Sequence, residues 1–302
     1  MNAVRELLEE MLARVLQPAG AGWLAAARAE CSRGAGPERF SALLALASRH
    51  APRGALAPTA AEIARAAEAS RGWNPERWSA LDAVRALLVV SRADLAEPTL
   101  EAALEEAFRY ADVGEMVALH RSLQLLPAPE RFVWRAGEGC RSSIRAVFEA
   151  AACDTGFPAA NFDDLAWRQL AIKALFVEAP LWRVHGLDER LDPELARMAL
   201  DLAEERRSAG RPVQHELWLC LGPHGGERGL RSIERELAGS NTLGRRAAAI
   251  ALARAGGLER LSELLGRERD PAVAATMRDA LQGRIQQRVF RELDPTTPAG
   301  KR

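Results

Sequence analysis

The chain has 302 residues, enough for one large domain or two modest ones with a buried core. It contains 14 valines, 6 isoleucines and 7 threonines, too few β-branched residues for the interior of a large sheet, which favours an all-α fold. Because 41 basic residues balance 41 acidic ones, no overall field attracts nucleic acid, and we expect no nucleic-acid partner. Of the basic residues 39 are arginine, so a lysine inside the chain is an exception.

The first sixteen residues predict an amphipathic helix and not a signal peptide, because glutamates and an arginine interrupt its apolar positions. No apolar run approaches the roughly 20 residues needed to span a bilayer, so we expect no membrane span. The run 86–90 is short enough to belong to a buried helix. The four cysteines are far apart in sequence and form no C-x-x-C pair, as expected for reduced thiols in the cytoplasm.

Glycine and proline divide the chain into segments of helix length. Thr59 with Glu62 three residues on has the pattern of a capping box, and Thr99 stands similarly before 102–109. Successive segments of this kind predict antiparallel helix pairs in an array resembling an α-solenoid.

Residues 225–290 repeat a helical pattern with a period of about 28 residues, in which Asp270-Pro271 precedes the last helix. This pattern resembles HEAT-like repeats, and we expect 225–290 to continue the array formed by 1–224. Any two amphipathic hairpins give a similar pattern, so the alternative of unrelated hairpins stays open. Residues 291–302 lack an apolar period and predict a disordered tail.

Motifs for metal and nucleotide binding are incomplete. His215-Glu216 begins an H-E-x-x-H motif, but Leu219 stands where the second histidine belongs. The glycines at 222–229 lack the spacing of a dinucleotide-binding loop. Asp163-Asp164 has no third aspartate beside it to hold magnesium. We therefore expect neither a metal nor a cofactor.

The segment 157–223 is the richest in mixed aromatic, charged and turn residues. Asn161 is a candidate helix cap, and Asp163 falls in the first turn that follows. Beyond it, helical spacing predicts a buried stripe, with Gln169 and Lys173 at its border. The stripe consists of Phe162, Leu165, Ile172 and Phe176.

Lys173 at such a border has two interpretations. It could be functional, as a buried amine held by a carboxylate, a ligand-binding cation or a nucleophile whose pKa is lowered by desolvation. It could also be an ion-paired or snorkelling structural lysine, which is the commoner case. Arg183 and the run with Asp188 and Arg190 form a charged turn. Such a turn lines a pocket mouth or, more commonly, supplies an Asp–Arg pair that locks two helices.

Six of the seven tryptophans likewise have a functional and a structural interpretation. They could form a platform for a flat apolar metabolite, with arginines supplying cation–π contacts, or simply pack the core. They are Trp73, Trp78, Trp134, Trp167, Trp182 and Trp218.

Within this segment the sequence resembles the EboA family. The central resemblance is carried by residues 161–165, 173–176, 186–190, 194–198 and 216–218, and further similar stretches occur at 78–88, 110–112 and 115–119. It covers roughly residues 1–223. Two positions depart from the family pattern, because Arg207 and His224 stand where aromatic residues are expected.

The resemblance implies a bacterial accessory protein encoded beside a UbiA-type membrane prenyltransferase and several other enzymes, in clusters associated with secondary-metabolite precursors. It transfers no catalytic residue. We therefore expect a non-enzymatic adaptor or apolar-metabolite-binding component of metabolite traffic. Its location would be cytoplasmic, free or peripheral at the inner face of the cytoplasmic membrane. The expected partners are the prenyltransferase, another cluster-encoded protein or an apolar small metabolite.

The expected ligand or partner surface comprises seven residues of the segment: Asn161, Asp163, Lys173, Arg183, Asp188, Arg190 and Trp218. The alternative function is an enzyme that modifies a prenylated or aromatic metabolite with Lys173 and a carboxylate. A third is a purely structural partner of the membrane prenyltransferase.

Overall fold

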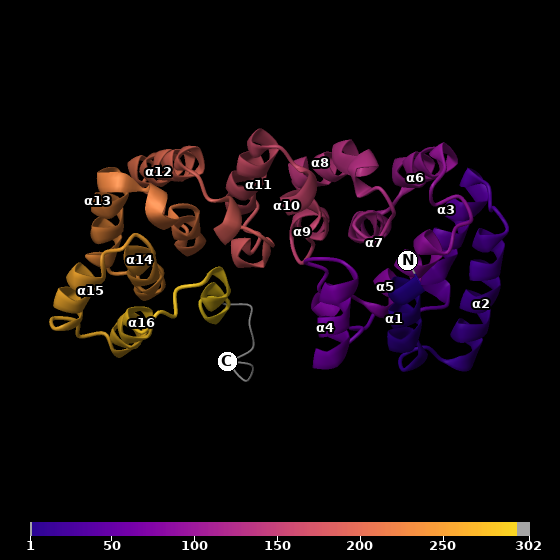
Figure 1. Cartoon of the computed structure of the whole chain (residues 1–302), viewed down its shortest axis with the longest axis horizontal. Coiled ribbons are helices and arrows are strands. Elements are labelled where there is room, and N and C mark those ends of the chain that lie inside the picture. Colours follow the sequence, from indigo (N-terminus) through magenta and orange to yellow (C-terminus); the bar gives the residue numbers. More distant parts are fainter. Residues whose placement is uncertain (1, 295–302) are drawn as a thin grey trace. The chain divides into compact units, whose positions relative to one another are not determined.

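The computed structural model describes residues 2–294, and this part of the chain is helical with no β-strand (Figure 1). The only bridge between extended residues in it joins Ala55 to Ser79. The prediction of an all-α fold is confirmed. The chain divides into two compact units, Met1–Asp163 and Asp164–Arg302.

The first unit surrounds one central helix. Every residue of α5 (Ala80–Val90) is buried, and α1, α2 and α7 pack against it. This confirms the expectation that the run 86–90 belongs to a buried helix. The other helices of the unit are α1 (Asn2–Ala13), α2 (Pro18–Ser32), α3 (Pro37–Leu46), α4 (Ala60–Ala69), α6 (Pro98–Tyr110), α7 (Val113–Leu123), α8 (Val133–Arg141), α9 (Arg145–Ala152) and α10 (Phe157–Asn161).

Side-chain caps start three of these helices. The predicted capping box at Thr59 is confirmed, because Glu62 N donates to Thr59 Oγ1 at 3.2 Å and Thr59 N donates to Glu62 Oε2 at 2.7 Å. Ser79 and Asp112 form the same arrangement before α5 and α7. Thr99 is not a cap: α6 begins one residue earlier at Pro98, and the Thr99 hydroxyl donates to Asp94 instead.

Two arginines lie inside the apolar core around α5. Arg85, 2% exposed, donates from Nε to the carbonyl of Leu44 at 3.0 Å and pairs with Glu115 at 3.3 Å. Arg92 pairs with Asp94 and lies over the ring of Phe40. Since a buried charge is costly without partners, these contacts fix how α3, α5 and α7 pack.

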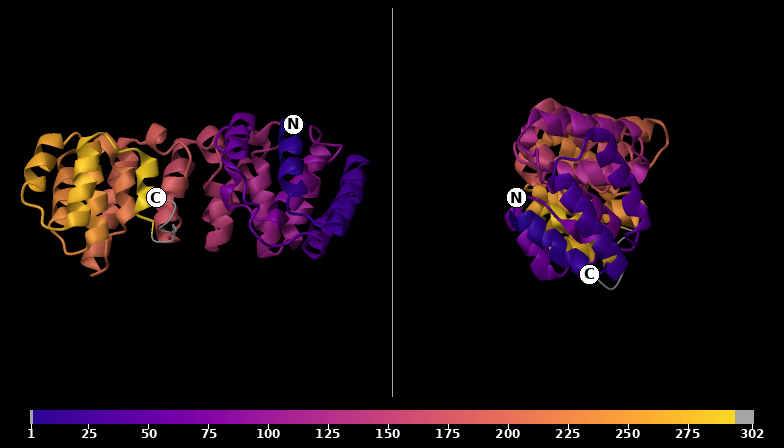
Figure 2. Two further views of the ribbon diagram at one scale, coloured as in Figure 1. Left: turned by 90° about the horizontal axis from the view of Figure 1, so that it is seen from below. Right: turned by 90° about the vertical axis from the view of Figure 1, so that its right-hand side faces the viewer.

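The second unit begins with α11 (Asp164–Phe176) and α12 (Pro193–Ser208). Two hairpins follow, formed by α13 (Gly226–Leu237) with α14 (Thr242–Arg254) and by α15 (Leu258–Leu265) with α16 (Pro271–Leu281). Figure 2 shows these helices side by side, with α14 packed against both α13 and α16.

Asn241 and Asp270 cap the second helix of each hairpin, about one predicted period apart. The HEAT-like character of the hairpins and the boundary after residue 224 remain predictions. α13 also packs against α12, so residues on both sides of that boundary share the second unit.

The beginning of the predicted tail belongs to the packed structure. The 3₁₀ helix η8 (Gln287–Glu292) buries Phe290 completely, and Leu293 is only 4% exposed. The Gln287 side chain donates to the carbonyls of Trp182 at 2.8 Å and Val184 at 2.6 Å. The rest of the tail, 295–302, lies outside the described residues.

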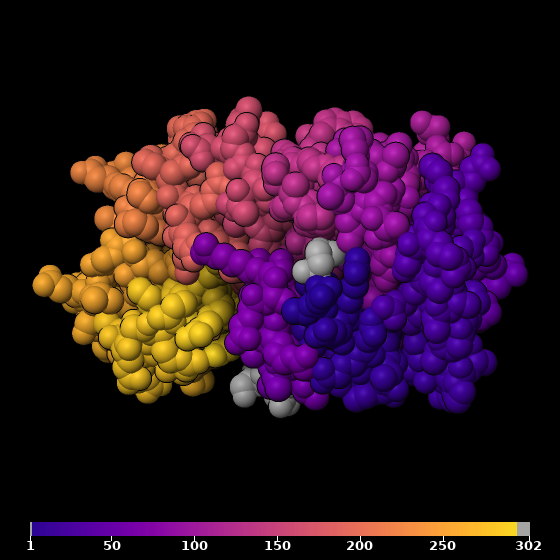
Figure 3. Space-filling model, turned by 45° about the vertical axis from the view of Figure 1, so that its right-hand side comes forward, coloured from indigo at the N-terminus to yellow at the C-terminus, as the bar shows by residue number. Residues whose placement is uncertain are grey.

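On the face of the first unit seen in Figure 3, the N-terminal helices in indigo and purple form much of the surface. None of the helices in the described residues is both long and apolar enough to cross a bilayer.

We expect Glu62→Gln to flatten the acid limb of the stability curve. The Arg14 guanidinium holds the pKa of Glu62 at about 2, against the opposing effect of burial and with help from Thr59. A depressed folded-state pKa gives stability that is complete above the unfolded value near 4.5 and is lost as the pH falls toward 2.

Urea unfolding of wild type and variant between pH 2 and 6 measures this effect. Glu68→Gln, an exposed glutamate on the same helix, is the control and should behave as wild type. An unchanged acid limb in Glu62→Gln would contradict the assignment.

Candidate functional site

The helix α11 turns its predicted apolar stripe outward. Its buried face consists of Trp167, Leu170, Ala171, Ala174 and Leu175. Leu165 and Phe176 are 61% and 57% exposed, and Phe162 lies before the helix begins. Phe162 itself is buried and Ile172 is half-buried, so the prediction that the stripe faces the core is wrong for Leu165 and Phe176. The helix presents Leu165, Gln169, Ile172 and Phe176 on one face, which we call the α11 outer stripe.

Lys173 borders the α11 outer stripe and is half-buried. Its side chain has no hydrogen bond or ion pair with another residue in the described part of the chain. This geometry matches a snorkelling lysine more closely than a buried amine held by a carboxylate.

Asn161 and Asp163 belong to the end of the first unit. Asn161 is the last residue of α10, and its Nδ2 donates to the carbonyl of Phe157 at 2.8 Å. The prediction that Asn161 caps the following helix is therefore wrong, because α11 begins only at Asp164. Asp163 is exposed and ends the unit.

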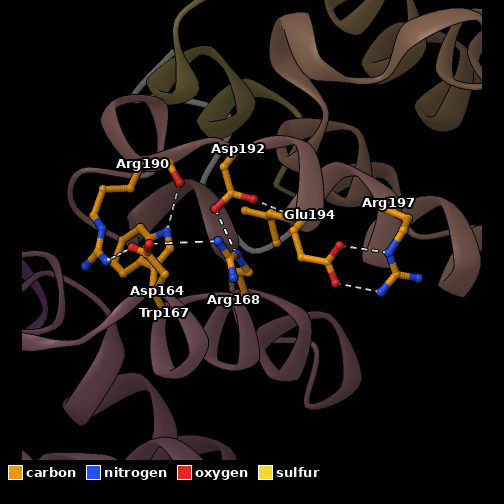
Figure 4. A network of polar contacts seen from close by, with 8 residues as sticks. Asp164, Trp167, Arg168, Arg190, Asp192, Glu194 and Arg197 are labelled. Carbon is orange, nitrogen blue, oxygen red and sulfur yellow. Dashed lines mark hydrogen bonds and ion pairs between the residues drawn. The ribbon is translucent and has the colours of Figure 1, made fainter.

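Arg190 joins a polar network between α11 and α12 (Figure 4). Its guanidinium donates to Asp164 at 3.0 Å and lies 4.7 Å above the ring of Trp167. The indole Nε1 of Trp167 donates to the Arg190 carbonyl at 3.2 Å. One arginine thus fixes both the charge and the aromatic side chain at the start of α11.

Asp192 is the centre of the same network. It accepts from Leu195 N at 2.7 Å, which caps α12, and from Arg168 Nε at 2.8 Å (Figure 4). Burial opposes its ionisation, but the hydrogen bonds from Leu195 and Arg168, the positive charge of Arg168 and the backbone N–H of Glu194 together lower its pKa. Sequence reasoning missed this residue, although Asp followed by Pro193 is a recognisable helix-start signal.

Asp188 connects three parts of the second unit. Its carboxylate accepts from Arg254 at 2.6 Å and from the backbone N of Gln287 at 2.9 Å. It therefore links the turn after α11 to α14 and η8. This favours the interpretation of the charged turn as an Asp–Arg lock between helices. Arg183, from the same turn, is buried at 8% exposure.

The tryptophans are mainly core residues. Trp73, Trp167 and Trp218 are almost completely buried, and Trp73 packs against Trp78 with centroids 5.9 Å apart. Trp134 is 61% exposed. The core-packing interpretation is favoured over a shared aromatic platform.

Arg207, which replaces an expected aromatic residue, lies 5.6 Å above the ring of Trp218. It also donates to Ser232 at 2.7 Å and pairs with Glu236 at 3.2 Å. The arginine thereby covers Trp218 and ties α12 to α13.

The other side chains that could bind a metal or act as nucleophiles do not form a cluster in the described residues. No group of three or more His, Cys, Asp or Glu within residues 2–294 is placed to hold a metal ion. All four cysteines are buried, and none forms a disulfide in the described structure. Burial raises the pKa of Cys31 to about 11 and that of Cys140 to about 12.

These features define an all-helical protein whose ionic contacts mainly join helix to helix. Residues 4–222 match the family model described as metabolite traffic protein EboA, and the chain belongs to this family. The resemblance seen in the sequence is confirmed. No curated protein and no solved structure with which the chain was compared matches it.

We expect Asp192→Ala to lower the free energy of unfolding by about 1 kcal/mol, because α12 loses its cap. The same change leaves Arg168 with only the distant carboxylate of Asp164, at 3.9 Å. Urea unfolding monitored by circular dichroism measures the effect.

Glu194→Ala is the matched control in the same network, since Glu194 pairs with Arg197 on the exposed side of the same helix. Its unfolding midpoint should equal that of wild type. Equal midpoints for both variants would show that Asp192 does not hold the network together.

Proposed function

We propose that the chain is a non-enzymatic accessory protein of metabolite traffic that works as an adaptor, binding a partner protein through the α11 outer stripe. Family membership supports the general role in metabolite traffic. The exposure of Leu165 and Phe176 carries the specific part of the proposal.

The stripe has the geometry of a helical docking surface. Leu165 and Phe176 are eleven positions apart, about three helical turns, and therefore share one face of α11. Side chains of this size on one exposed face lose unfavourable contact with water when a partner covers them. Lys173 lies at the edge of this surface, where a partner carboxylate would be attracted.

The scaffold beneath the stripe is fixed. Trp167 on the opposite face of α11 is buried and held by Arg190, and Arg168 is held by Asp192. A helix anchored in this way presents its outer side chains with little loss of conformational entropy on binding.

The enzymatic alternative requires a carboxylate beside Lys173. Asp188, the acidic member of the predicted site in the second unit, is engaged by Arg254 and Gln287 instead. This contact favours a structural role for Asp188 and supports binding over catalysis.

For the partner we propose a UbiA-type membrane prenyltransferase or another protein encoded beside the chain. An adaptor for such a partner would act in the cytoplasm, at the inner face of the membrane. Its role would be to bring cluster-encoded proteins together or to deliver an apolar metabolite.

Photo-crosslinking in cells tests the docking surface. Benzoylphenylalanine replaces Leu165 or Phe176 in separate variants, and Tyr110, which is 70% exposed in the first unit, is replaced as the control. We expect a cross-linked band of one defined partner at positions 165 and 176 and none at 110. Mass spectrometry identifies the partner.

Lys173→Ala combined with benzoylphenylalanine at 165 tests the charge at the border and should weaken the same band. Cross-links of equal intensity at all three positions would overturn the proposal, as would a band at 165 that survives Phe176→Asp.

A further inference from the structure

A groove of about 670 Å³ lies in the second unit, between the first helices of the two C-terminal hairpins. We call it the α13–α15 groove. Its lining comes from α13, α14, α15, the following loop and α16, and consists of three carboxylates, four arginines and four apolar side chains. This volume falls within the range of sites for small molecules. The groove lies beyond residues 4–222, which match the family.

Two of its three carboxylates, Glu268 and Glu234, pair with arginines of the groove itself. Glu268 pairs with Arg245 and accepts the backbone N–H groups of Arg269 and Asp270, each at 2.8 Å. Asp270 caps α16 and accepts from Thr242 at 2.7 Å. Burial opposes the ionisation of Glu268, but its hydrogen bonds and Arg245 lower its pKa. The pKa of Asp270 is also lowered, mainly by the hydrogen bond from the Thr242 hydroxyl. Asp270 therefore stays negatively charged, and the groove lining holds four arginines against three carboxylates, an excess of one positive charge.

The third carboxylate, Glu234, is held by Arg260 across the groove at 2.8 Å. Arg260 also pairs with Glu263 at 3.0 Å on its own helix. The charged groups that α13 and α15 place in the groove, Glu234 and Arg260, thus pair with one another.

Two further arginines line the groove without such a contact. The exposed side chains of Arg267 and Arg269 have no hydrogen bond or ion pair with another described residue. They come from one short loop, and this loop is held in shape by the hydrogen bonds to Glu268. Arg267 and Arg269 are two positions apart and line the same groove, and guanidinium groups match the several acceptor oxygens of a phosphate group.

The apolar lining completes the site. Leu237 is 7% and Met277 2% exposed, and Leu264 is half-buried beside them. An anion that entered the groove with an apolar chain attached would place that chain against these side chains.

We propose that the α13–α15 groove binds a small amphiphile, in which Arg267 and Arg269 bind the phosphate group and Leu264 contacts the apolar chain. This goes beyond the adaptor role and does not depend on the α11 outer stripe.

Isothermal titration calorimetry of the full chain with dodecyl phosphate, below its micelle-forming concentration, tests the inference. Arg267→Ala with Arg269→Ala should weaken binding by at least about tenfold, because charge-assisted hydrogen bonds are lost. Leu264→Ser should weaken dodecyl phosphate binding and leave the weaker binding of inorganic phosphate unchanged. Dodecyl maltoside, which has the chain without the charge, should not bind.

Arg33→Gln with Arg231→Gln is the control, since it removes two exposed positive charges outside the groove. It should bind as wild type. Equal loss in the control pair would overturn the inference, because attraction would then depend on net charge alone. Binding only to vesicles containing phosphatidic acid, with none of dodecyl phosphate, would also overturn it and indicate a membrane surface instead.

Arg267 follows the last turn of α15, where a positive charge interacts favourably with the helix dipole. The alternative to phosphate binding is that Arg267 only stabilises this helix. In that case the double alanine variant would unfold at lower urea concentration while its affinity for dodecyl phosphate stayed unchanged, which contradicts the proposal.

Discussion

Arginine–carboxylate pairing between helices is the interaction on which this fold depends. Among the described contacts, Arg14, directly after α1, pairs with Glu62 of α4, Arg121 joins α7 to Asp82 of α5 at 2.6 Å, and Arg207 joins α12 to Glu236 of α13. Pairs on the open surface contribute little to stability. These pairs are largely shielded on at least one side, and removing one partner would leave the other charge poorly solvated. They therefore fix which helix lies against which.

The same arginines also position the aromatic core. Arg190 lies over Trp167, Arg207 over Trp218 and Arg121 over Trp78. Each of these guanidinium groups has an acidic partner besides the ring. The α11 outer stripe and the loop of Arg267 and Arg269 are the surfaces on which our two proposals rest.

Local signals in the sequence predicted the helices well because caps and breakers act over a few residues. Thr59 with Glu62 is a complete capping box, and the run 86–90 belongs to a buried helix. Which face of α11 is buried could not be predicted in the same way. The helix has apolar residues on both faces, and its spacing alone does not tell whether Trp167 or Phe176 faces the core.

Contacts distant in sequence explain the remaining errors and omissions. Asp188 meets Arg254 and Gln287, which no local pattern connects to it. Of the predicted site, the structure gives Arg190 and Asp188 defined roles in two separate contacts, and leaves Lys173 beside the outer stripe. Asn161 ends the short helix α10, because Phe157-Pro158 begins a helix of its own.

The central claim is that this chain acts by binding and not by covalent chemistry. Native mass spectrometry of the protein isolated from its own cells tests it most directly. We expect a non-covalent complex with one partner polypeptide, which Leu165→Ser with Phe176→Ser dissociates, and an unmodified Lys173 after denaturation. A chain that carries a covalent adduct on Lys173 and no partner would contradict it.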